Sequence, residues 1–160
     1  MMIKMTVQEI QAKIAQKLAR LRILREQAEA YQSIITQNSV LLEELVRTRE
    51  TIRELIELKK KGVTSKKVFV RIGLGTFVAT ELPIPEKILL NIGADVLVLV
   101  PLADALALVT QTEEEVKNET MRVQNLLNGI IRLIEKEENE VLQLQQKLAQ
   151  LSQHRKSISS

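Results

Sequence analysis

The chain has 160 residues, which suits a single domain, and only 2% of them are aromatic. A net charge of +3 with 27% charged residues of both signs excludes a strong electrostatic footprint for nucleic acid or anionic lipid. The absence of cysteine excludes disulfides and thiolate chemistry. The sequence begins without the apolar run of a secretory signal, and its most apolar stretch, 96–109, is too short to span a bilayer. We therefore expect a cytoplasmic protein with no membrane or nucleic-acid partner.

Residues 6–61 predict one long helix of a coiled coil. Thr6 and Glu9 have the spacing of a capping box, in which each side chain bonds to the other residue's backbone amide. A seven-residue repeat then runs through the segment, and twelve of its sixteen seam positions are apolar. Three lysines followed by Gly62 suit the end of a helix, which at 1.5 Å per residue would be roughly 84 Å long.

Residues 66–100 predict two β-hairpins. Apolar and β-branched residues form four short runs at 68–72, 76–82, 87–92 and 96–100, separated by turns rich in glycine and proline. The last two runs are apolar on both faces, and four short strands cannot bury two faces or close their own edges. We therefore expect these hairpins to join subunits through a shared sheet or barrel. The expected interface residues are Val68, Val70, Ile72, Phe77, Ile88, Leu90, Ile92, Val96, Leu97, Val98 and Leu99.

Residues 101–158 predict a second long helix. Pro101 suits a first helical turn, and the seven-residue repeat returns after it. Thr112 with Glu115 offers a competing capping box, and a break near 110–112 stays open. Pro101 is the preferred start because the repeat passes through residue 112 without a change of phase.

Two helices joined by a compact connection should pack antiparallel, and their register can be predicted. Placing Ile56 opposite Leu106 brings the seam residues Arg49 and Glu113 together. Breaking such a pair costs about 3–5 kcal/mol when it is buried, so it can select the register. The same register brings a cluster of basic residues beside an acidic one: Arg20, Arg22 and Arg25 beside Glu137, Glu138 and Glu140.

The seam also contains the polar residues Lys17, Asn38 and Glu137. They could supply specificity or a polar inner surface. The simpler interpretation, which we favour, is that long side chains on a half-exposed seam extend into solvent.

No set of residues predicts catalysis, a cofactor or a metal. The Gly73–Gly75 pair lacks the third glycine and the GK[ST] run of a phosphate loop, and His154 is the only histidine. The acidic runs 113–115 and 135–140 suit solvated helix faces. We therefore expect a protein that is not an enzyme.

The order of helix, two hairpins and returning helix resembles prefoldin subunits of the α class. RIGLGTFVATEL (71–82) is similar to the first-hairpin signature of this family, and ILLNIGADVLV (88–98) to its second hairpin. LADAL (102–106) resembles the motif that opens the return helix. The chain departs from the family at Arg71, where members often carry proline, and in the turn PIPE (83–86).

The resemblance implies an ATP-independent chaperone. Its hairpins would form a β-barrel platform, and its coiled-coil tips would grip non-native protein and deliver it to a group II chaperonin. Partners would be β-class prefoldin subunits in a hexamer, or copies of the chain itself, even as a filament. The expected client-binding residues at the tips are Met2, Ile3, Met5, Val7, Ile10, Ile14, Leu148, Leu151 and Ile158.

Two alternatives stay open at this stage. One is a purely structural oligomer or filament in which the helices act as spacers. The other is a nucleic-acid-associated adaptor, which the lack of a basic stripe disfavours.

Overall fold

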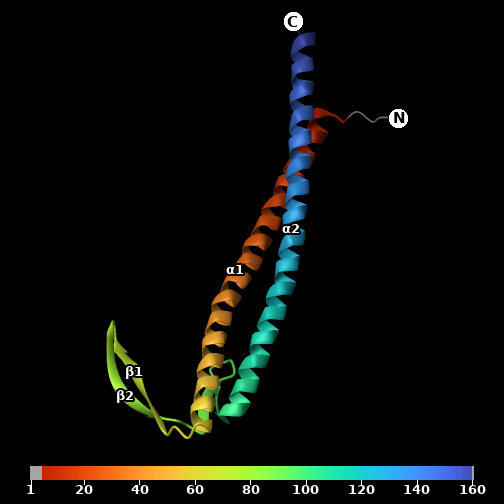
Figure 1. Ribbon diagram of the computed structural model, residues 1–160. Coiled ribbons are helices and arrows are strands. Elements are labelled where there is room, and N and C mark those ends of the chain that lie inside the picture. Colours follow the sequence, from red (N-terminus) through yellow and green to blue (C-terminus); the bar gives the residue numbers. More distant parts are fainter. Residues whose placement is uncertain (1–4, 160) are drawn as a thin grey trace. The chain divides into compact units, whose positions relative to one another are not determined.

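The computed structural model describes residues 5–159, which form two long helices and two antiparallel hairpins (Figure 1). This arrangement confirms the expected fold class. The elements are α1 (Val7–Lys60), β1 (Ser65–Gly73), β2 (Thr76–Pro83), β3 (Lys87–Asn91), β4 (Leu97–Pro101) and α2 (Leu102–Ile158). They divide into two compact units. The terminal unit contains the chain up to Gln37 and from Glu119 onward, and the hairpin unit contains Asn38–Asn118.

Helix α1 begins and ends with the caps that its sequence predicts. The Glu9 amide donates to Thr6 Oγ1 at 3.2 Å, and the Thr6 amide donates to Glu9 Oε2 at 3.1 Å, which forms the capping box. At the other end, Gly62 adopts a left-handed φ of 76°, and the Val63 amide donates to the Leu58 carbonyl at 3.0 Å. This is the Schellman geometry, and glycine adopts the required backbone without the steric penalty of a Cβ.

Helix α2 begins one residue later than expected and has no break. Pro101 is the last residue of β4, where it lies opposite Lys87, and the helix starts at Leu102. Thr110 and Thr112 lie inside the helix, and each hydroxyl donates to the carbonyl four residues earlier, at 2.7 and 2.9 Å. Thr112 is therefore not a helix cap.

The core of the hairpin unit forms where the two helices meet the β3–β4 hairpin. Five buried residues make up this core: Ile52, Leu55, Leu102, Ala105 and Val109. Ile88, Leu90 and Val100 from the hairpin pack against it. Opposite residues in an antiparallel pair share a face, and the register pairs Ile88 with Val100 and Leu90 with Val98. One face of β3–β4 therefore covers the helices.

The β1–β2 hairpin has no such inner face. The two strands pair from Ser65 opposite Pro83 to Gly73 opposite Thr76, with a bulge between Arg71 and Gly73. Every residue from Phe69 to Pro83 is exposed. An isolated two-stranded hairpin is marginally stable in water. The described chain therefore leaves this hairpin without the packing that a stable sheet needs.

Candidate functional site

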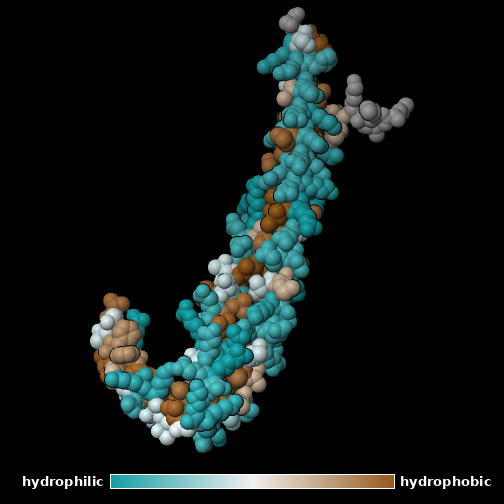
Figure 2. All heavy atoms as spheres, in the orientation of Figure 1, coloured by the Kyte–Doolittle hydropathy of each residue, from teal (hydrophilic) through white to brown (hydrophobic). Residues whose placement is uncertain are grey.

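Both faces of the β1–β2 hairpin expose apolar residues, and one face also carries the opposed charged residues Lys67 and Glu81. One face carries Phe69 and Ala79 as an opposed pair, followed by Arg71 opposite Phe77. Phe69 is 71% exposed, which is unusual for a side chain of this size. The other face carries aliphatic residues: Val68, Val70, Ile72, Val78 and Leu82. On the side in view, Figure 2 shows hydrophobic residues over the outer part of this hairpin.

The β3–β4 hairpin adds an outward face made of three leucines. Leu89 lies opposite Leu99, and Leu97 follows on the same side of β4. All three are about 60% exposed. Sequence analysis missed Leu89, because alternation shows which residues share a strand face but not which face meets the helices.

Some residues expected at a subunit interface have a different place in the structure. Ile88 and Leu90 pack against the helical core of their own chain, and Val98 shares their face. Their side chains are therefore partly buried within their own chain, and their place at a subunit interface remains a prediction. Ile92 and Val96 lie at the turn end of the hairpin and are exposed.

Two buried glutamates on α2 are held by cations, one in each unit. In the hairpin unit, Glu113 is 3% exposed, and its carboxylate lies 3.4 Å from Arg49 Nη1 and 3.1 Å from Lys117 Nζ. The Arg49–Glu113 ion pair expected from the seven-residue repeat is therefore present. Arg49 Nε is buried without a hydrogen-bond partner. The role of this pair in setting the register remains a prediction.

In the terminal unit, Glu137 is 4% exposed and lies 3.1 Å from Lys17 Nζ and 3.4 Å from Arg20 Nη1. Lys17 also bonds to Glu140. The hydrogen bonds that Lys17 donates to Glu140 and Glu137 raise the pKa of Lys17, and the Lys17 ammonium lowers the pKa of Glu140. Lys17 and Glu137 therefore pair with each other across the two helices. The interpretation that they extend into solvent was wrong.

The arginine cluster beside these residues pairs only in part as expected. Arg25 Nη2 lies 2.8 Å from Glu138 Oε1 on the other helix. Arg22 instead lies 3.5 Å from Glu26, one turn along its own helix. These pairs are solvent-exposed and contribute little stability.

A family model for the prefoldin subunit matches residues 24–154, which include both hairpins and most of both helices. The chain belongs to the prefoldin family. It is also 25% identical to prefoldin subunit alpha of Archaeoglobus fulgidus over 134 residues, which cover 84% of this chain and 95% of that protein. Both findings agree with the expected α-class prefoldin subunit. Family membership implies a chaperone rather than an enzyme, and it implies assembly with other prefoldin subunits.

The tip residues expected to contact client proteins have mixed environments in this prefoldin subunit. Ile158 is exposed, while most of the others are partly buried: Met5, Val7, Ile14, Leu148 and Leu151. Ile10 is only 1% exposed and belongs to the packing between the helices, so it is not available to a client. Met2 and Ile3 lie outside the described residues.

The terminal unit also exposes apolar residues that sequence analysis did not single out. They include Leu18, Ile23, Met121, Leu126 and Leu142, each more than two-fifths exposed. They flank the seam positions of the repeat, so a search restricted to the seam could not find them. Between residues 5 and 159 no three acidic, histidine or cysteine side chains cluster to hold a metal, and neither helix has an apolar stretch that could cross a bilayer.

Proposed function

We propose that this prefoldin subunit assembles through the outward faces of its hairpins and acts as an ATP-independent holdase. The observation that carries the proposal is the β1–β2 hairpin, whose residues from Phe69 to Pro83 are all exposed. Full burial of one large apolar side chain stabilises a protein by about 1.5–3 kcal/mol. Covering two apolar faces with neighbouring hairpins supplies the packing that the chain alone lacks. A closed barrel would also remove the strand edges.

The neighbouring hairpins come from β-class prefoldin subunits or from copies of this chain. The revised interface consists of both faces of β1–β2 and the outward leucines of β3–β4. Its residues are Val68, Phe69, Val70, Ile72, Phe77, Val78, Leu82, Leu89, Leu97 and Leu99.

Client capture belongs to the terminal unit. Aliphatic and methionine side chains at its tips, including the partly buried Met5 and the exposed Ile158, suit contact with varied unfolded chains. Because the ion pairs around Glu137 hold the helices together, the two helix ends can present these side chains as a fixed surface. A captured protein would then pass to a group II chaperonin.

The test is suppression of client aggregation by the assembled protein. Removal of residues 1–14 and 148–160 is expected to preserve assembly and abolish suppression, because the hairpins remain and the tips are lost. A matched variant with five exposed polar tip residues replaced by alanine should retain suppression. If the truncated protein still suppresses aggregation, client capture by the tips is wrong. If the full-length oligomer never suppresses aggregation, the structural-oligomer alternative holds.

A further inference from the structure

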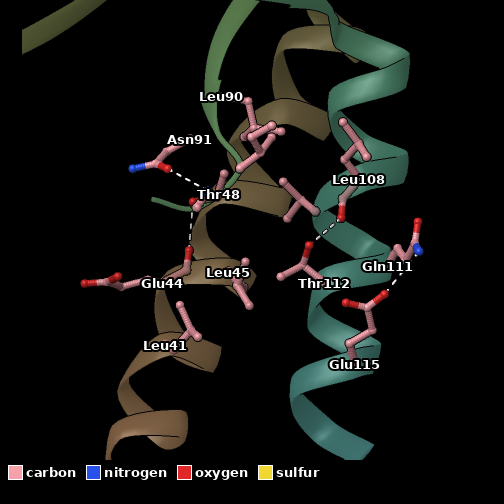
Figure 3. A pocket seen from close by; sticks show the side chains of 13 residues that line it. Leu41, Glu44, Leu45, Thr48, Leu90, Asn91, Leu108, Gln111, Thr112 and Glu115 are labelled. Carbon is pink, nitrogen blue, oxygen red and sulfur yellow. Dashed lines mark hydrogen bonds between the residues drawn. The ribbon is translucent and has the colours of Figure 1, made fainter. Parts of the chain in front are cut away.

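The hairpin unit contains a groove of about 750 Å³ that the described chain leaves open. Its walls come from α1, α2 and the turn end of the β3–β4 hairpin, as Figure 3 shows. Leu41 and Leu45 on α1 and Leu108 on α2 line it together with Leu90 and Ile92 of the hairpin. Leu41, Ile92 and Leu108 are all more than a third exposed. The groove therefore offers apolar surface to a partner.

The charged residues that line this groove are both acidic. Glu44 stands on the α1 wall and Glu115 on the α2 wall, and both side chains are exposed. The described lining residues include no lysine or arginine. A complementary partner therefore needs an apolar projection beside a positive charge.

The tip of the β1–β2 hairpin has this combination. Leu74, at the apex of the turn, is 93% exposed. Arg71 lies just before the bulge, and its Nε donates to the Gly73 carbonyl at 3.1 Å, which holds the guanidinium over the turn. Phe77 lies opposite Arg71 on the same face. The tip thus places one cation beside two large apolar side chains.

We propose that the β1–β2 tip of a second copy of this chain docks in the groove, with Leu74 against its leucines and Arg71 between Glu44 and Glu115. This inference rests on the proposed assembly and assigns one of its contacts. The tip of the same chain does not fill the groove, since its residues from Phe69 to Pro83 are all exposed. Each copy carries both a tip and a groove. If two copies each dock their tip in the other's groove, they form a closed symmetric dimer. If each copy docks its tip in the groove of the next copy, they form an open filament.

Crosslinking tests this contact directly, because the chain has no cysteine. Full-length Leu74→Cys and Leu108→Cys proteins are mixed and treated with a short bis-maleimide reagent. Tip docking predicts a covalent dimer that contains one chain of each kind. The matched control pairs Leu74→Cys with Leu142→Cys, an exposed leucine of the terminal unit, and should give only background linkage.

Charge reversal sharpens the test. Arg71→Glu in the Leu74→Cys chain should lower the yield of crosslinked dimer at least about threefold, because the new carboxylate would be repelled by Glu44 and Glu115 in the groove. Adding Glu44→Lys and Glu115→Lys to the Leu108→Cys chain should restore the yield. Failure of this restoration, with oligomers still forming, contradicts the assigned charge pairing.

The mass of each uncrosslinked sample separates the two proposals. Oligomers without Leu74–Leu108 linkage overturn tip docking and leave hairpin assembly standing. A chain that stays monomeric on its own overturns tip docking, and a chain that stays monomeric even with a β-class prefoldin subunit present overturns both. A further variant carries Leu74→Cys and Leu108→Cys in the same chain. If the two cysteines crosslink within a monomer, the tip docks in the groove of its own chain, which contradicts the inference. Linkage that appears only with a different prefoldin subunit also contradicts the choice of a second copy.

Discussion

The helices and the β1–β2 hairpin place their apolar residues in opposite environments. Along the helices, repeat residues such as Ile10, Leu21 and Ile52 are almost fully buried by the other helix or by β3–β4. Along β1–β2, residues of the same kind are exposed on both faces. The helices thus bury these repeat residues within one chain, whereas the described chain leaves the apolar residues of the hairpin uncovered. Under the proposed function, the helix repeat determines the fold of one chain and the β1–β2 hairpin determines its assembly.

The largest expected effect comes from making the hairpin polar. Phe69→Ser with Phe77→Ser should abolish assembly, because it removes the aromatic residues from one face of β1–β2. Analytical ultracentrifugation measures the change. Leu142→Ser, at an exposed leucine of the terminal unit, is the matched control and should leave the mass unchanged. If the double variant forms the same oligomer as the wild type, the β1–β2 hairpin does not carry assembly.

The same contrast predicts unequal effects on the stability of the dissociated chain. Ile52→Ala should lower its free energy of unfolding by about 2–5 kcal/mol, because Ile52 is 2% exposed and its removal leaves a cavity. Ile72→Ala, on the exposed hairpin, should change it by about 0.5 kcal/mol or less. Denaturant unfolding followed by circular dichroism measures both. Equal losses would show that β1–β2 is buried within a single chain.

The ion pair in the hairpin unit predicts an intermediate effect. Arg49→Leu should destabilise the chain by about 1–3 kcal/mol, because the buried Glu113 carboxylate then keeps only Lys117 as a partner. Glu113→Leu combined with Arg49→Leu should recover most of this loss, since no buried charge remains unpaired. A double-mutant cycle that gives strictly additive losses would show that the two residues do not interact.

The smallest effect is the pH dependence of the pair between Lys17 and Glu140. The pKa of Glu140 is lowered below its usual 4.5, so its stabilising effect is complete above pH 4.5 and fades as the pH falls. The pKa of Lys17 is raised above 10.5, so its effect is complete below pH 10.5 and fades as the pH rises. The stability difference between the wild type and Lys17→Met should therefore be constant between these limits and shrink outside them. A difference that grows in acid would contradict this.

Much of this architecture follows from local sequence signals. The capping box at Thr6, the glycine cap at Gly62 and the seven-residue repeat predict α1 and the Arg49–Glu113 pair. Each of these depends on residues close in sequence or on a regular period. The β3–β4 hairpin is different, because both faces are apolar and alternation alone cannot tell which one packs on the helices.

The Lys17 interactions were missed for another reason. The predicted register pairs only residues whose Cβ atoms lie directly opposite each other on the two helices. A lysine side chain is long enough to reach a carboxylate one or two turns away along the partner helix. Lys17 therefore pairs with Glu137 and Glu140, although the expected register places neither directly opposite it. Predicting such pairs requires side-chain geometry, which the repeat does not contain.

The mass of the purified full-length chain over a range of concentrations tests the central claim most directly. The exposed faces of β1–β2 predict that the chain self-associates into oligomers or longer assemblies, and that Phe69→Ser with Phe77→Ser returns it to monomers. A stable, monodisperse species of 18.2 kDa with intact hairpins at every concentration, both alone and mixed with a β-class prefoldin subunit, would contradict the account.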